Sequence, residues 1–272
     1  MSENKTTQHN FDEEIEGWSD FMKECYARAE QDKMELSKKL GKKIEYLFLP
    51  NPESEICHNP EICPKPKYLF LGMEPGTPDG RTCFFPLFLH YCAYKYLCGE
   101  NFNYYITDLA KGAMQPEYAN ETKKERYPVW LPLFAKELNL LGKPEIIAIG
   151  KTMYDGMING FEDCSGKKHK FGRVQNWIRH YSKGAAFIFM KKEYENKKKI
   201  FPELDSYRLE ESELREFADT LKEHLNFERC NVDSDYYEFL IKDSLNKLYT
   251  DTTFPVYRYN FEQFINKGKI IH

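Results

Sequence analysis

The chain has 272 residues, which suits one large domain or two small ones, and 41% of them are hydrophobic, enough for a full core. The net charge of −4 neither requires nor excludes a nucleic-acid partner, because such a partner needs only a local basic face. No secretory signal and no apolar run of membrane-spanning length is present, so we expect a cytoplasmic protein without a membrane partner, whose eight cysteines are reduced thiols.

The N-terminal part of the chain divides into a polar tail, a helix and a proline-rich loop. Residues 1–10 are polar, and we expect them to be disordered, with a single domain over residues 11–272. Apolar residues recur at helical spacing from Phe11 to about Leu40, which predicts a long amphipathic helix. A short strand or an extended segment is expected at Tyr46–Leu49, followed by a loop that carries four prolines between Asn51 and Lys67.

Short apolar runs then alternate with helical patterns along the middle of the chain. Four runs read as strands: Tyr68–Leu71, Tyr104–Thr107, Glu145–Gly150 and Val174–Arg179, although Ala185–Met190 competes with the last. The predicted helices lie at Phe84–Leu97 after Pro86, Val129–Leu141, Lys151–Met157 and Glu210–Leu225, and residues 230–272 are aromatic-rich and of mixed type.

This alternation predicts an α/β fold: a three-layer α/β/α arrangement around a central, mainly parallel four-stranded sheet, with extra helical segments at both ends of the chain. Parallel sheets of this kind bind ligands outside the carboxyl ends of their strands. The loops after Leu71, Thr107, Gly150 and Arg179 are therefore the expected place for a functional site.

The first of these loops carries a carboxylate on a constrained backbone. Gly72–Gly80 follows a buried strand directly, and its glycines and prolines fix a tight turn around Glu74. Such a turn can hold backbone N–H groups and one acid against a ligand. An ordinary turn with an exposed Glu is the competing interpretation.

The run Leu69-Phe70-Leu71-Gly72-Met73-Glu74-Pro75-Gly76 resembles the first catalytic motif of the uracil-DNA glycosylase superfamily. That motif is a hydrophobic strand followed by Gly-x-Asn-Pro-Gly or Gly-Gln-Asp-Pro-Tyr. The resemblance implies that Glu74 handles the attacking water, that Met73 contacts the base and that Gly76 contacts DNA. It also implies that Phe84, or failing it Phe85, stacks on the flipped base.

A second motif, Tyr104-Tyr105-Ile106-Thr107-Asp108, resembles the family strand that ends in an Asn reading the pyrimidine edge. The departure to Asp108 changes the hydrogen-bonding pattern, because an ionised Asp only accepts, whereas an Asn accepts and donates. Asp108 would face the O4 acceptor of uracil with another acceptor, but would suit the N4–H donor of a cytosine-type base. We therefore expect a modified cytosine; a helix-capping role for Asp108 is the alternative.

Two further segments follow in the family's order. The strand that ends at Gly150 leads into a helix, whose N-terminus and Lys151 could hold a DNA phosphate. Arg179-His180-Tyr181-Ser182-Lys183 resembles the family's His-Pro-Ser motif, which implies that His180 stabilises the departing base anion. Ser182 and Lys183 would then contact DNA, although Tyr181 replaces the usual Pro.

The resemblance covers about residues 65–190 and implies a monomeric, monofunctional DNA glycosylase that needs no cofactor or metal. One family branch carries an iron–sulfur cluster, but Lys111-Gly112-Ala113 stands where its Cys would be. Cys57, His58 and Cys63 could bind zinc, but no second ligand pair follows them. Two lysine-rich stretches are candidate basic faces or plain solvated surface: Lys191–Lys199, and Lys123, Lys124 and Arg126.

Three other functions stay open at this point. A glycosylase of the same fold could act on uracil or another deaminated base, and a non-catalytic DNA-binding protein could keep the fold without the chemistry. The chain could also be an unrelated flavodoxin-like or nucleotide-binding α/β protein.

Overall fold

The computed structural model describes residues 16–44, 46–48, 65–74, 87–99, 102–114, 116–174, 176–180, 205–224, 238, 242 and 253–267. The expected disorder of residues 1–10, the candidate zinc ligands, the alternative strand at Ala185–Met190 and the basic stretch Lys191–Lys199 all lie outside these ranges.

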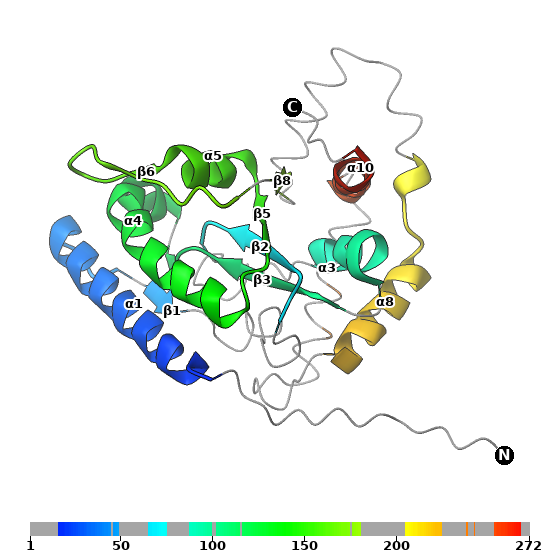
Figure 1. Ribbon diagram of the computed structural model, residues 1–272, viewed down its shortest axis with the longest axis horizontal. Helices are drawn as coiled ribbons and strands as arrows, with labels where there is room; N and C mark the ends of the chain where they lie inside the picture. The colour runs from blue at the N-terminus through cyan, green and yellow to red at the C-terminus, as the bar shows by residue number, and fades with distance from the viewer. Residues whose placement is uncertain are drawn as a thin grey trace, which may run out of the picture.

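A four-stranded sheet forms the centre of the molecule (Figure 1). Its order is β3 (Tyr104–Asp108), β2 (Tyr68–Gly72), β5 (Glu145–Ile149) and β8 (Asn176–Ile178). Every neighbouring pair is parallel, which confirms the predicted α/β class and the parallel sheet. Of these four strands β2 comes first in the chain, and it lies between β3 and β5, the second and third. The direction in which the chain winds across the sheet therefore reverses between β2 and β5. In open parallel sheets such a point opens a crevice at the carboxyl ends of the two strands.

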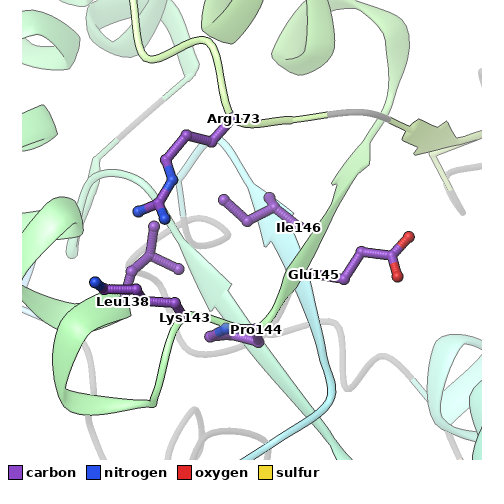
Figure 2. A pocket seen from close by; sticks show the side chains of 6 residues that line it. All are labelled: Leu138, Lys143, Pro144, Glu145, Ile146 and Arg173. Carbon is purple, nitrogen blue, oxygen red and sulfur yellow. The ribbon is translucent and has the colours of Figure 1, made fainter.

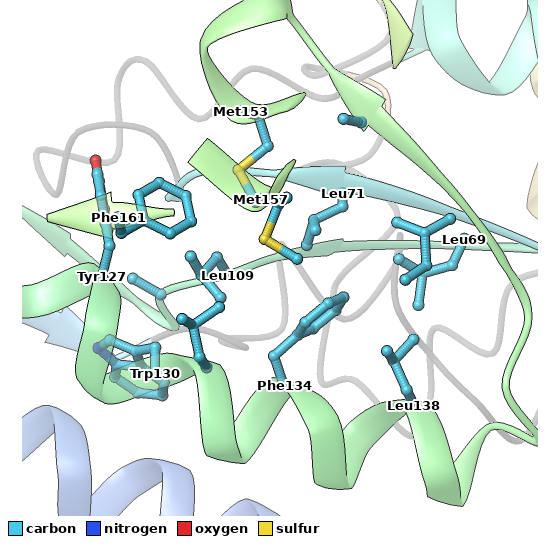
Figure 3. Packing of buried hydrophobic residues seen from close by; sticks show 14 of the residues in the cluster. Leu69, Leu71, Leu109, Tyr127, Trp130, Phe134, Leu138, Met153, Met157 and Phe161 are labelled. Atoms are coloured by element: carbon cyan, nitrogen blue, oxygen red, sulfur yellow. The ribbon is translucent and has the colours of Figure 1, made fainter. Parts of the chain in front are cut away.

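Helices cover both faces of this sheet because successive strand residues point in opposite directions. Leu69, Leu71, Ile146 and Ala148 belong to one buried cluster, and Phe70, Ile106, Ile147 and Ile149 belong to the other. The first cluster includes residues of α1 (Trp18–Leu40), α4 (Pro116–Leu140) and α5 (Lys151–Asn159), as Figure 3 shows for α4 and α5. The second includes residues of α3 (Leu87–Ala93), α8 (Glu211–His224) and α10 (Thr253–Lys267). The π-helical continuation of α3, η1 (Tyr94–Cys98), packs against it with partly buried residues.

Most of the predicted elements are confirmed, with one large difference. The helix expected at Val129–Leu141 is α4, and it begins at Pro116, thirteen residues earlier. Pro128 and Pro132 lie inside it, and each removes one backbone donor and would be expected to stop a helix. The helix continues because its inward face buries Trp130 and Phe134 against the sheet, which offsets the cost of the prolines.

The described residues also form two separate two-stranded sheets. β1 (Tyr46–Phe48) pairs antiparallel with β4 (Gly112–Met114), and β6 (Phe161–Glu162) pairs antiparallel with β7 (Lys168–His169). A 3-10 turn, η3 (Asp205–Tyr207), precedes α8. Among the described residues, we find no helix with the length and apolar character that a bilayer crossing requires.

Candidate active site

Residues predicted for the site come together at the carboxyl edge of the sheet. Asp108 is the last residue of β3, Met73 and Glu74 directly follow β2, Lys151 begins the helix after β5, and His180 follows β8. With adjacent strands about 4.8 Å apart, the strands that lead to Glu74 and His180 are separated by about 10 Å. These residues therefore lie along one edge of the sheet, at the carboxyl ends of its four strands.

Glu74 is fixed by two neighbouring residues of α4. Arg126 Nη2 lies 2.6 Å from Glu74 Oε2, and the Tyr127 hydroxyl donates to Glu74 Oε1 at 3.2 Å. Arg126 is 1% exposed and Glu74 is 21% exposed, so the charge pair extends from the interior to the surface. Burial, and then the nearby Glu74 carboxylate, raise the pKa of Tyr127, which keeps its hydroxyl a donor. The interpretation of Glu74 as a freely exposed turn residue is therefore wrong.

Arg126 is also not part of a basic surface, as its neighbours Lys123 and Lys124 had suggested. Its Nε donates to Thr122 Oγ1 at 3.0 Å, and its guanidinium lies 5.3 Å from the centre of the Tyr127 ring. Lys123 and Lys124 are exposed. The buried aromatic residues that follow Arg126 were the available signal that this turn of α4 faces inward.

Asp108 lies against the neighbouring strand at Gly72, its partner in the β-ladder. A Cβ placed on Gly72 would be 2.0 Å from Asp108 Oδ1, so the carboxyl occupies the space that the glycine leaves free. Burial raises the pKa of Asp108 from 3.8 to about 7, with Glu74 and Glu137 adding to the rise and Lys111 opposing it. Near neutral pH this carboxyl therefore exists in both the protonated and the ionised form.

The alternative in which Asp108 caps a helix is wrong. After Asp108 the chain runs beside the end of β2, with the Leu109 N–H donating to the Gly72 carbonyl at 3.0 Å and the Ala110 N–H to the Met73 carbonyl at 3.1 Å. It then enters strand β4 instead of a helix. The carboxyl of Asp108 is thus not engaged at a helix N-terminus.

A buried ion pair lies below the end of β3. Lys111 Nζ is 2.8 Å from Glu137 Oε2 and also donates to the Asp108 carbonyl at 2.7 Å. The side chains of Lys111 and Glu137 are 8% and 1% exposed. The hydroxyls of Tyr105 and Thr107 donate to the other carboxylate oxygen, Glu137 Oε1, at 3.2 and 2.9 Å. This network fixes the backbone of Asp108, a role that no sequence pattern around Lys111 indicated.

The other half of the edge is formed by the ends of β5 and β8. Gly150 has a φ of +89°, and its N–H donates to the Ile178 carbonyl at 2.7 Å. A Cβ at Gly150 would lie in ordinary van der Waals contact with His180 Cβ, at 3.6 Å, so the histidine lies directly beside this turn. His180 is exposed, yet the protein around part of its ring lowers its pKa, which favours the neutral imidazole at pH 7.

Lys151 stands at the start of α5, as predicted, but its ammonium group pairs with Asp155 one turn later, at 2.8 Å. Both groups are exposed, and a pair of this kind contributes only about 0–1 kcal/mol. A phosphate could therefore compete for Lys151. The other predicted contacts, Gly76, Phe84, Phe85, Ser182 and Lys183, lie outside the part of the chain that the structure describes.

A separate pocket of about 400 Å³ opens at the opposite, amino-terminal end of β5 (Figure 2). It is lined by Leu138, Lys143, Pro144, Glu145, Ile146 and Arg173. None of the predicted site residues lines it. Since parallel sheets place their ligand sites at the carboxyl edge, we assign the candidate active site to the Glu74 edge and not to this pocket.

The fold and site together define an α/β protein with a parallel sheet and two carboxyl groups at neighbouring strand ends. A scan against protein-family models finds no match for the chain, and searches of curated proteins and of solved structures find none either.

Proposed function

We propose that the protein is a DNA glycosylase similar to the uracil-DNA glycosylase superfamily, which flips a pyrimidine-type base out of DNA and hydrolyses its glycosidic bond. The observation that carries this proposal is the pair of carboxyl groups at the ends of β2 and β3. Glu74 is held in an ion pair with Arg126, whereas burial moves the pKa of Asp108 to about 7. Two acids with opposite environments in one site are typical of enzymes that assign them different roles.

In this proposal Glu74 acts on the sugar side of the bond. Its carboxylate is held by Arg126 and Tyr127, so it can orient a water molecule and stabilise positive charge on the sugar as the base leaves. The departing base carries negative charge, which the neutral imidazole of His180 stabilises by donating a hydrogen bond. The target base must leave the stack for either contact to form.

Asp108 would read the edge of the flipped base. In its protonated form it accepts from the N4–H of cytosine and donates to N3, whereas the ionised form loses the donor. The protonated form could equally pair with O4 and N3–H of uracil, so a uracil-type substrate is the alternative. A modified cytosine of the kind found in phage DNA is a target absent from the cell's own DNA, which suits an antiviral defence role.

The direct test incubates the purified protein with DNA duplexes that differ only in carrying uracil, cytosine or a modified cytosine at one position. We expect abasic sites, seen as strand cleavage after alkali, in the modified-cytosine duplex and not in the cytosine duplex. Glu74→Gln should remove most turnover while DNA binding is retained. Glu145→Gln, at an exposed acid on the opposite edge of the sheet, is the matched control and should be fully active.

The proposal fails if no duplex acquires abasic sites, or if Glu74→Gln is as active as the wild type. DNA binding without any excision would instead favour a non-catalytic DNA-binding protein.

A second candidate is favoured by the strand order. In chain order β2 is the first strand of the central sheet, and it lies between β3 and β5, the second and third. Flavodoxin-like proteins have the same order and bind a flavin nucleotide at the corresponding crevice. A nucleotide that copurifies with the protein and is visible in its absorbance spectrum would support this alternative.

A further inference from the structure

We infer that the hairpin Phe161–Lys170, which contains β6 and β7, binds the phosphate backbone of duplex DNA beside the candidate active site. This lysine hairpin is not part of any motif that resembles the glycosylase superfamily. The inference rests on the proposed function, because it assigns a surface of this chain to the same DNA partner.

The base of the lysine hairpin is connected to the site. Phe161 packs on Tyr127 with ring centres 5.4 Å apart (Figure 3). The Tyr127 hydroxyl in turn donates to Glu74. Gly156 makes room for this ring, since a Cβ there would lie 2.3 Å from Phe161 Cε1. Lys124 of α4 adds an ion pair to Glu162 at 2.8 Å. The side chains of Phe161 and Tyr127 therefore connect the hairpin to the proposed catalytic carboxylate.

The turn of the hairpin is held by one carboxylate. Asp163 Oδ1 accepts from the backbone N–H groups of Ser165 and Lys167 at 2.9 and 3.0 Å, and from the Ser165 hydroxyl at 2.7 Å. Its Oδ2 lies 2.7 Å from His169 Nε2. These contacts hold the pKa of Asp163 far below its usual range. The turn is thus preorganised, and its acidic group is already fully engaged within the hairpin.

Three lysines are left to face the solvent. Lys167, Lys168 and Lys170 are exposed, and none of them forms an ion pair with another described residue. Lys168 and Lys170 lie on the same side of the returning strand, because a Cβ at Gly160 would be 2.9 Å from Lys168 Cβ and 3.1 Å from Lys170 Cγ. The two acids of the hairpin, Glu162 and Asp163, are paired with Lys124 and His169.

Duplex DNA is the partner that this arrangement fits best. Residues two apart on a strand are separated by about 6.6 Å, so Lys168 and Lys170 can reach neighbouring phosphates of one DNA strand. The protein carries a net charge of −4, so a polyanion needs a local cationic surface on which to dock. A preformed hairpin also loses little conformational freedom when it binds.

The test measures binding of a short fluorescent DNA duplex to the full chain as a function of salt concentration. The variant K167Q/K168Q/K170Q removes the three hairpin charges. K65Q/K67Q/K143Q removes three exposed lysines at the amino-terminal edge of the sheet and is the matched control. Circular dichroism and thermal melting show whether both variants are folded.

We expect the hairpin variant to bind at least about tenfold more weakly at low salt, with a slope of log affinity against log salt that is smaller by about two, one for each phosphate that Lys168 and Lys170 reach. The control should keep the wild-type slope. Equal losses in the two variants, or a wild-type slope in the hairpin variant, would overturn the inference while the excision assay stands. A wild-type protein that binds no duplex would overturn both this inference and the proposed function.

Discussion

Replacing Asp108 with Asn should make the protein more stable, and increasingly so as the pH rises. Burial raises the pKa of Asp108 from 3.8 to about 7, so between these pH values the unfolded chain loses a proton that the folded protein keeps. The unfolded state then binds fewer protons, and the free energy of unfolding falls with increasing pH. Below the lower pKa this loss is absent, and above the higher pKa it is complete.

The full loss corresponds to about 4 kcal/mol, an upper bound because Asp108 keeps partial contact with solvent. An Asn has nearly the same shape and cannot ionise, so D108N should recover up to this amount above pH 7 and much less near pH 4. Urea denaturation of wild type and variant at both pH values measures the difference. Asp219→Asn, at an exposed acid of α8, is the control. An equal effect of D108N at the two pH values would refute the argument that burial controls this carboxyl.

Three other outcomes follow from the same site. Arg126→Met should lower the free energy of unfolding by about 3–5 kcal/mol, because it leaves Glu74 without its charge partner. Adding Glu74→Gln should restore part of that loss, which a double-mutant cycle by denaturant unfolding measures. If the protein excises a base as proposed, Gly72→Ala should fold but lose most of this activity, since its Cβ would displace the Asp108 carboxyl; unchanged kcat/KM would contradict the proposed role of Asp108. If protonated Asp108 reads the base, the wild-type excision rate should fall about tenfold per pH unit above pH 7, and D108N should lack this decline.

The sequence by itself determined the strands of the central sheet and the edge at which the candidate site lies. The apolar runs at residues 68–72, 104–108 and 145–149 are strong local signals, because a strand buried on both faces must be continuously hydrophobic. Once those strands are parallel, their carboxyl ends meet at one edge, so the convergence of Glu74, Asp108 and His180 on that edge could be predicted.

The interactions between residues far apart in the chain were decided only by the tertiary structure. In the sequence, Arg126 looked like part of an exposed basic stretch. In the structure, the packing of α4 buries it against Glu74, which lies 52 positions earlier in the chain. The same packing carries α4 through Pro128, which local rules place at the start or outside of a helix. The pKa of Asp108 likewise depends on the burial that Gly72 permits and on the ion pair of Lys111 and Glu137. Burial and electrostatic interactions are sums over neighbours in space, and the linear sequence does not specify those neighbours until the chain has folded.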